Sequence, residues 1–278
     1  MKQDSKLTTK RRWLRWLGGA VALVGAGVLF RKPLLRNALA LAIDNDQYDT
    51  KSVSFLDSET CVVTSRTIEG PFFVPSSPLR SDIRDRQLGQ KLKLSLKFVG
   101  SVTCKPIAGV AVHIWHANAE GRYSGYEGHS PDEVELTPGH LPVESEQRFL
   151  RGHQITSDAG MVEFTTIVPA WYSFRTPHIH AKVLLPDNQS LTTQLYFPDS
   201  MNKWVRETMV PYNERLSPLV SNRSDPVIRA SKGAPGGWLK IAKSMEGDVV
   251  AFEGTLTIGV QAEAVDTPQS LTPRPAKT

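Results

Sequence analysis

The 278-residue chain contains only two cysteines, Cys61 and Cys104. This scarcity limits the protein to a single disulfide. An even cysteine count in an exported protein predicts that the two thiols are bridged, and the alternative is a pair of buried free thiols. A bridge between them would close a loop of about forty residues and would stabilise the fold by about 3 to 4 kcal/mol.

The chain also lacks an apolar run long enough to cross a membrane comfortably. The longest candidate, Trp16–Phe30, has fifteen uncharged residues, whereas a transmembrane helix needs about 20. The run follows the paired Arg11 and Arg12, a layout that resembles a twin-arginine export signal. We therefore expect residues 1–42 to act as an export signal or membrane anchor, which places the protein in the periplasm or anchored facing it.

Small residues that suit signal cleavage occur at 38–40 and 40–42, which both read A-L-A. Three basic residues separate these sites from the apolar run: Arg31, Lys32 and Arg36. Such residues argue against cleavage. Removal of the leader and its retention as an anchor, with membrane contact through residues 13–36, therefore both stay open.

Outside this leader, the chain has no excess of basic over acidic residues. Residues 1–42 hold nine of the 33 Lys and Arg but only one of the 28 Asp and Glu, so the rest of the chain is mildly acidic. The sequence pI of about 9.2 thus reflects the leader. Because a nucleic-acid-binding domain concentrates positive charge on its own surface, we expect no nucleic-acid partner.

Strong helical periodicity is missing as well, except for a short piece around residues 202–210. Residues 91–99 alternate instead, with Leu92, Leu94 and Leu96 facing away from the lysines between them, as in a half-buried strand. Further strands are predicted at 110–115, 147–156, 161–168, 178–185, 192–197 and 249–258. Many short strands separated by turn residues predict an all-β fold, an antiparallel β-sandwich with long loops.

Four segments are expected along the chain. The leader occupies residues 1–42, and a polar linker or arm occupies 43–60. The β-sandwich domain spans 61–262. The Thr- and Pro-rich residues 263–278 are predicted to form a disordered tail.

Chemically capable side chains gather in residues 168–183, which read V-P-A-W-Y-S-F-R-T-P-H-I-H-A-K-V. Pro177 has no amide hydrogen and pushes the residue before it toward extended conformations, so the segment is a turn that runs into a strand. On a strand, His178 and His180 point to the same side and can share one metal ion. Tyr172 is a candidate phenolate ligand, and Arg175 is a permanent cation that stabilises anions nearby.

The His-x-His pair also occurs as a solvated or core pair in proteins that bind no metal. Further ligands are therefore required for a metal site. A cupin-type site is disfavoured, because the residues after His180 include no glutamate within the next five positions.

Three ordered motifs add the missing ligands. They are I-W-H-A-N-A-E-G-R-Y at residues 114–123, P-A-W-Y at 169–172 and R-T-P-H-I-H at 175–180. In this order they resemble the intradiol ring-cleavage dioxygenases, which include catechol and protocatechuate dioxygenases. The segments E-G-P-F at 69–72 and T-T-Q-L-Y-F at 192–197 look like further parts of that family, so the resemblance spans roughly residues 60–200.

The resemblance implies a ferric iron site. Its metal ligands would be two tyrosinates, Tyr123 and Tyr172, and two histidines, His178 and His180. The implied cofactor is Fe(III), which hard phenolate donors favour over softer metals. Residues 61–262 would then form the catalytic domain.

The implied reaction cleaves a catechol between its two hydroxylated carbons. The substrate would chelate the iron and displace Tyr172, and both atoms of O2 would enter a cis,cis-muconate-type diacid. Arg175 would stabilise anionic character at the ring, and with Tyr172 it forms the catalytic pair. The six-residue spacing from Tyr172 to His178, the leader and the cysteine pair resemble an exported branch of the family.

Other aromatic and polar residues receive structural roles. We expect Tyr126 and Trp171 in the pocket wall, His116 in the core or behind the ligands, and Gln194 near a ligand or water. The remaining histidines are expected at the surface or in loops: His113, His129, His140 and His153.

The rival interpretation is an exported metal-binding β-sandwich without oxygenase activity, in which Tyr123 and Tyr172 are core residues. Substitution of the two tyrosines discriminates between the two readings. The particular catechol is left open by the sequence, and a homodimer would fit the family resemblance.

Overall fold

The computed structural model describes residues 63–129, 132, 140–231, 237–246 and 249–261. Backbone contacts divide the chain into two units, residues 1–47 and 48–278, and the fold below belongs to the second unit. The predicted leader, the linker and the tail at 263–278 lie outside the described residues. Cys61 does as well, so its bridge to Cys104 stays a prediction.

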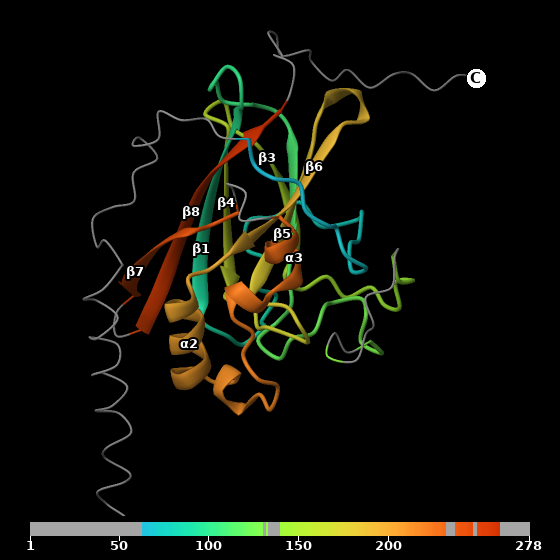
Figure 1. Cartoon of the computed structure of the whole chain (residues 1–278). Helices are drawn as coiled ribbons and strands as arrows, with labels where there is room; N and C mark the ends of the chain where they lie inside the picture. The colour runs from blue at the N-terminus through green and yellow to red at the C-terminus, as the bar shows by residue number, and fades with distance from the viewer. Residues whose placement is uncertain (1–62, 130–131, 133–139, 232–236, 247–248, 262–278) are drawn as a thin grey trace, which may run out of the picture. The chain divides into compact units, whose positions relative to one another are not determined.

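In the described part of the chain, eight strands form two four-stranded sheets (Figure 1). The first sheet has the order β4 (Met161–Ile167), β1 (Lys91–Gly100), β8 (Val249–Val260), β7 (Lys240–Glu246). The second has the order β3 (Arg151–Ile155), β2 (Ala111–Trp115), β5 (His178–Leu184), β6 (Ser190–Tyr196). The all-β prediction is confirmed for the described part of the chain, which contains few helices.

The helical pieces in the described ranges are short: one lies between β5 and β6, and the others follow β6. They are α2 (Asp199–Thr208), α3 (Pro226–Ala230) and the 3₁₀ turns η2 (Pro186–Asn188), η3 (Tyr212–Glu214) and η4 (Asn222–Ser224). The predicted helix near residues 202–210 corresponds to α2, which begins three residues earlier. In the described ranges, no helix is long and apolar enough to span a membrane.

Two details of the strand prediction are wrong. β7 was not predicted, because Lys240–Glu246 does not alternate between apolar and polar residues. The first sheet is also not purely antiparallel, since β1 and β8 pair in parallel from Leu92↔Phe252 to Gly100↔Val260. A parallel pair joins strands that are distant in the sequence, and side-chain alternation within one strand carries no information about the direction of its neighbour.

The alternation in β1 is confirmed and explains how the first sheet packs. Leu92, Leu94 and Leu96 are almost fully buried, whereas Lys93 on the other face is exposed. β2 differs because both of its faces are covered: Val112 and Ile114 are buried, and so are His113 and Trp115. The strand that carries the first motif therefore lies entirely inside the protein.

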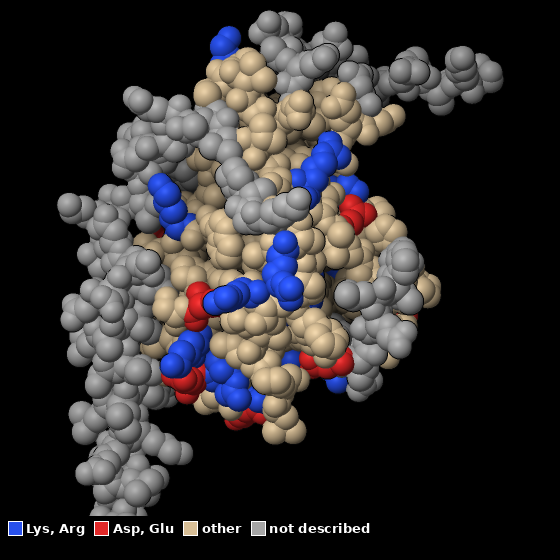
Figure 2. All heavy atoms as spheres, viewed as in Figure 1, with Lys and Arg blue, Asp and Glu red and all other residues tan. Residues whose placement is uncertain are grey.

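Charged side chains of both signs are mixed on the surface. Figure 2 shows Lys and Arg next to Asp and Glu on the viewed face, with uncharged atoms covering most of it. One pair is the contact of Lys91 Nζ with Glu246 Oε2 at 2.5 Å, which links β1 to β7. Exposed pairs of this kind contribute little to stability.

Candidate metal centre

Two of the donor side chains come from the first residues of β5. His178 and His180 lie on the same face and are 1% and 2% exposed, and their Nε2 atoms are 3.2 Å apart. Ile179 is buried as well, but on the opposite face of the strand. The expected common face of the two imidazoles is confirmed.

Tyr172 arrives from a tight turn just before β5. The turn is closed by hydrogen bonds from the amide of Arg175 to the carbonyl of Tyr172 (2.8 Å) and from the amide of Tyr172 to the carbonyl of Arg175 (3.3 Å). At its tip, Phe174 adopts a left-handed backbone conformation with φ of 66°. The turn carries the Tyr172 hydroxyl back to His178, at 3.1 Å from Nε2.

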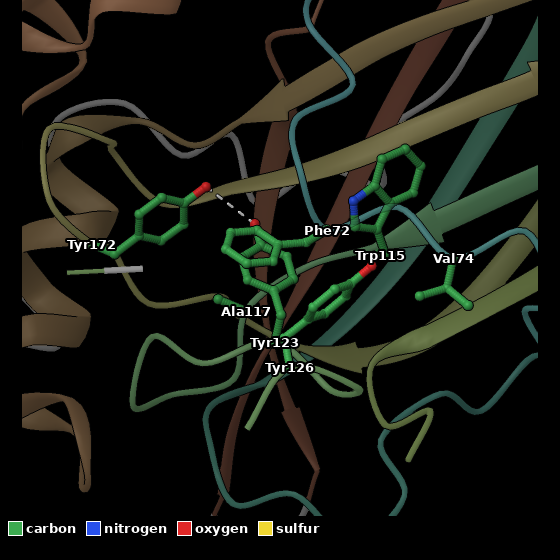
Figure 3. Packing of buried hydrophobic residues seen from close by; sticks show 7 residues of the cluster. All are labelled: Phe72, Val74, Trp115, Ala117, Tyr123, Tyr126 and Tyr172. Atoms are coloured by element: carbon green, nitrogen blue, oxygen red, sulfur yellow. Dashed lines mark hydrogen bonds between the residues drawn. The ribbon is translucent and has the colours of Figure 1, made fainter. Parts of the chain in front are cut away.

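Tyr123 comes from the loop that leaves β2. Asn118 shapes this loop, because its Oδ1 accepts hydrogen bonds from the amides of Glu120 and Arg122. Gly121 supplies the positive φ of 83° that the turn requires. The Tyr123 hydroxyl lies 3.2 Å from that of Tyr172 and 3.2 Å from His180 Nε2, and Figure 3 marks the contact between the two phenols.

The four donor atoms thus form a closed ring. Each of the four edges, Tyr123–Tyr172, Tyr172–His178, His178–His180 and His180–Tyr123, measures 3.1 to 3.2 Å. Ligand atoms that share one metal ion at about 2 Å lie at about this spacing from one another. Within the described ranges, no three His, Cys, Asp or Glu side chains gather, so the phenols are the donors that complete a set with the two imidazoles.

The histidine tautomer also suits a metal. His178 Nδ1 lies 2.7 Å from the carbonyl oxygen of Thr176, which can only accept a hydrogen bond. Nδ1 therefore carries the proton, and Nε2 presents a lone pair to the centre. A backbone carbonyl behind a metal-binding imidazole is a common way to fix its orientation.

Burial keeps all four side chains neutral when no cation is bound. It raises the pKa of the Tyr123 and Tyr172 phenols above their usual value. It also lowers the pKa of the His178 and His180 imidazoles well below theirs. The imidazoles are therefore ready to bind a metal, whereas the phenols release their protons only when a strong cation replaces them.

Arg175 is buried beside the centre and has a partner that the sequence analysis did not identify. Its Nε donates to Asp225 Oδ2 at 2.9 Å, and its terminal nitrogen donates to Gln194 Oε1. Burial raises the pKa of Tyr172, and the positive charge of Arg175 offsets part of this rise because it favours the ionised phenol. Asp225 precedes Pro226 and caps α3. In the sequence it therefore looks like an ordinary helix cap, and nothing there indicates that it pairs with Arg175.

Two aromatic rings support the ligands from behind. Phe72 stacks on Tyr123 with centroids 4.5 Å apart, and Trp115 stacks on His180 at 4.8 Å. Both belong to the buried cluster shown in Figure 3. Gly70 lies at the same place, because a Cβ there would be in ordinary van der Waals contact with His180 Cε1, at 3.5 Å. The segment at 69–72 therefore packs against the centre.

Arg151 is a second residue that the sequence analysis missed. It is 1% exposed and donates hydrogen bonds to the Phe72 carbonyl (2.6 Å) and to Ser124 Oγ (2.9 Å). Burial lowers its pKa to about 10. A lone arginine on a strand has no distinguishing pattern in the sequence, so only the packing reveals that it ties the segment at 69–72 to the Tyr123 loop.

The remaining expectations have mixed outcomes. His116 is a core residue, with Nδ1 at 2.8 Å from the Ala117 carbonyl and Nε2 at 2.7 Å from Thr166 Oγ1. Gln194 orients Arg175.

The expectation that His113 is at the surface is wrong: it is buried and stacks on His153 with centroids 4.8 Å apart. Because Phe73 covers the outer face of β2, the strand has no wet side.

The other candidates lie where they contact no donor atom of the ring. Tyr126 is buried and donates to the Phe73 carbonyl at 3.2 Å, and Trp171 donates to the Ser217 carbonyl at 3.0 Å. His129 pairs with Glu144, and His140 pairs with Glu69. None of these groups is placed to join the four donors.

An all-β fold in which two phenols and two imidazoles converge on one point is suited to hold a metal ion without a haem, and comparison with known proteins gives the family. A sequence profile described as Dioxygenase matches residues 68–214. This match covers all four donor residues and just over half of the chain. The protein belongs to the intradiol ring-cleavage dioxygenase family.

Curated relatives agree with this assignment at low identity. The chain is 27% identical to a chlorocatechol 1,2-dioxygenase of Rhodococcus opacus over 54% of its own length and 65% of that protein. It is 30% identical to a catechol 1,2-dioxygenase of Pseudomonas sp. (strain EST1001) over 69% and 64%. The chain thus spans just under two thirds of the length of these relatives.

A solved structure gives a fuller match. The intradiol ring-cleavage dioxygenase from Tetranychus urticae is 29% identical, with a TM-score of 0.66. The comparison covers 74% of this chain and 98% of that one. The fold around the centre is therefore shared with a protein of about the size of the described region.

Proposed function

We propose that this protein binds Fe(III) and cleaves a catechol-type aromatic with O2 between its two hydroxylated carbons, giving a cis,cis-muconate-type diacid. The observation that carries this proposal is the closed ring of donor atoms at 3.1 to 3.2 Å from Tyr123, Tyr172, His178 and His180. Family membership supports the same reaction class.

The donor set favours ferric iron. Two phenolates are hard, strongly donating anions, and together with two imidazoles they suit Fe(III) better than soft metals. When bound, Fe(III) would supply a Lewis acid that lowers the pKa of a chelating catechol and an electron acceptor that gives its ring the radical character needed to react with O2. The remaining steps are assigned to the side chains of the protein.

Tyr172 is the ligand best placed to give way to substrate. It is 8% exposed, against 1 to 2% for the other three donors. It also sits on a two-residue turn, Ser173 and Phe174, whereas the histidines are held in a sheet. A catechol that takes its position would give one of its two hydroxyl protons to the released Tyr172 oxygen, which burial favours in the protonated form, and the other to water.

Arg175 has the complementary task. Its guanidinium is fixed by Asp225 and Gln194 and cannot swing away. A fixed cation next to the released ligand stabilises negative charge that develops on the substrate ring, because it needs no reorganisation during the reaction. Phe72 and Trp115 exclude water from the other side of the centre.

The wider setting is proposed on the sequence. We propose that the two sheets pack as a sandwich and that Cys61 and Cys104 form a disulfide. We also propose that residues 1–42 direct export or anchor the protein facing the periplasm. Export is supported by Arg11 and Arg12 before the apolar run. The substrate would then be a catechol met outside the cytoplasm. A fusion of residues 1–42 to a reporter that requires export tests this, with Arg11→Lys plus Arg12→Lys as the loss-of-function control.

The reaction is tested by visible absorption of the purified, iron-loaded protein. We expect a tyrosinate-to-Fe(III) charge-transfer band, a shift to longer wavelength on anaerobic addition of catechol, and oxygen uptake once air is admitted. Tyr123→Phe and Tyr172→Phe should each weaken or shift the band. Tyr126→Phe is the matched control, because this phenol lies in the same cluster but its hydroxyl donates to the Phe73 carbonyl and not to a donor atom of the centre.

The outcome separates the proposal from the binding-module alternative. Iron binding without catechol turnover would favour an exported metal-binding module. A protein whose spectrum and metal content are unchanged by both tyrosine substitutions would refute the ligand assignment.

A further inference from the structure

The two loops that carry the tyrosine ligands are joined by a single guanidinium outside the centre, that of Arg215. Its Nη1 donates to the carbonyl of Glu120, three residues before Tyr123. Its Nη2 donates to the carbonyl of Trp171, one residue before Tyr172, at 2.8 Å. Arg215 lies just after η3, so it reaches both loops from a third part of the chain.

The same guanidinium also holds the residue that follows Tyr172, through Asp132. Arg215 Nη2 lies 3.1 Å from Asp132 Oδ2. The other carboxylate oxygen, Oδ1, accepts the amide of Ser173 at 2.9 Å, and the Asp132 carbonyl accepts the Ser173 hydroxyl at 2.7 Å. The backbone is therefore fixed on both sides of Tyr172.

The packing at Gly121 indicates that the fold is built around this contact. A Cβ at Gly121 would come within 2.8 Å of both terminal nitrogens of Arg215. The position thus accommodates the arginine only when the residue has no side chain, in addition to its positive φ of 83°. The Arg215 side chain is 9% exposed and also lies over the Trp171 ring, at 5.1 Å from its centroid.

We propose that Arg215, with Asp132, is a positioning pair that holds the Tyr123 and Tyr172 loops at the spacing at which both phenols can bind one metal ion. This inference rests on the proposed function. Neither residue contacts a donor atom, so both act through the backbone of the loops. The planar guanidinium is needed because it can donate in several fixed directions at once, whereas a lysine presents one compact charge.

The experiment compares Arg215→Ala, Arg215→Lys and Asp132→Ala with the wild-type full chain. Iron affinity is measured by chelator competition, and the charge-transfer absorbance is measured per bound iron. Loss of an outer-shell partner typically lowers metal affinity or activity about 10- to 100-fold, and we expect this range for Arg215→Ala, with a shifted or weaker band. Arg215→Lys should restore part of the affinity, because it keeps the ion pair with Asp132.

Arg206→Ala is the matched control. Arg206 lies over the same Trp171 ring, at 5.5 Å, but donates only to the carbonyls of Asn213 and Arg215. Loss of its packing should lower the melting temperature without changing the band. A spectral change in the Arg215 variants and not in Arg206→Ala separates positioning of the ligands from general stability.

The experiment distinguishes a failure of the positioning role from a failure of the proposed function. If wild-type protein shows no tyrosinate band with iron, the proposed function fails, and the positioning role fails with it. If wild type shows the band and the Arg215 and Asp132 variants keep its position, its intensity and the iron affinity, only the positioning role is overturned. Should Arg215→Ala not fold, Asp132→Ala decides, since Asp132 is 29% exposed.

Discussion

At the scale of single residues, the centre combines deep burial with an absence of net charge. Neutral phenols and imidazoles can be buried together at little electrostatic cost, whereas buried carboxylates would need counterions. Fe(III) bound by two phenolates would carry one net positive charge. Arg175, a fixed cation beside the four donors, is already paired with Asp225. Under the proposed function, a doubly deprotonated catechol would therefore meet a site with an unmet demand for negative charge.

The Arg175–Asp225 pair should be a strong determinant of stability. Both side chains are almost fully buried, and removing one partner of a buried pair costs about 3 to 5 kcal/mol. Asp225→Ala should therefore lower the free energy of unfolding by an amount in this range, measured by urea denaturation. It also removes the cap of α3 and the acceptor of the Thr176 amide.

Lys203→Ala is the control for Asp225→Ala. Lys203 forms an exposed i,i+4 pair with Glu207 at 3.9 Å, and such pairs contribute about 0 to 1 kcal/mol. Equal effects of the two substitutions would contradict the assigned importance of the buried pair.

At the scale of elements, the chemistry depends on β5, the turn before it and the loop that follows β2. The strand fixes two imidazoles on one face, and the turn before it returns a phenol to them. The neighbouring strand β2 runs antiparallel and pairs Trp115 with His180. The chain therefore leaves β2 beside the beginning of β5, which brings the Tyr123 loop to the same end of the sheet as Tyr172.

The alternation in β1 predicts a matched pair of substitutions in the other sheet. Leu94 is 1% exposed, and Leu94→Ala should lower the free energy of unfolding by about 2 to 5 kcal/mol, because it removes buried apolar surface and leaves a cavity. Lys93→Ala, one residue away on the exposed face, should change it by about 0.5 kcal/mol or less. Denaturant unfolding of both variants tests this, and a comparable loss in each would contradict the observed faces of the strand.

At the scale of the whole molecule, the centre links segments that are 57 residues apart in the sequence, from Tyr123 to His180. A ligand that binds the folded state but not the unfolded chain stabilises the fold, by about 2.7 kcal/mol at 100 times its dissociation constant. Removal of iron by a chelator should therefore lower the melting temperature, and adding Fe(III) back should restore it.

The iron-dependent shift in melting temperature should be smaller in Tyr123→Phe, because one of the four donors is lost while the ring that packs on Phe72 remains. Differential scanning calorimetry of the iron-loaded and chelated forms measures both shifts. An equal shift in wild type and Tyr123→Phe would mean that the iron binds elsewhere.

Much of this protein follows from its sequence alone. Alternation places Leu92, Leu94 and Leu96 in a core because the side chains of a strand have a period of two. The same rule puts His178 and His180 on one face, and Pro177 fixes where the strand begins. The ligand set came from a resemblance of ordered motifs, and the structure brings all four of these residues together.

Tertiary structure decided the rest, because contacts between distant segments leave no periodic signal. The parallel pairing of β1 with β8, the burial of His113 beneath Phe73, and the Asp225 partner of Arg175 each join parts of the chain far apart in sequence. Arg151 and Arg215 look like ordinary charged residues until the loops fold against them. The sequence determined which side chains could form a metal centre, and the packing determined what holds them at 3.1 to 3.2 Å from one another.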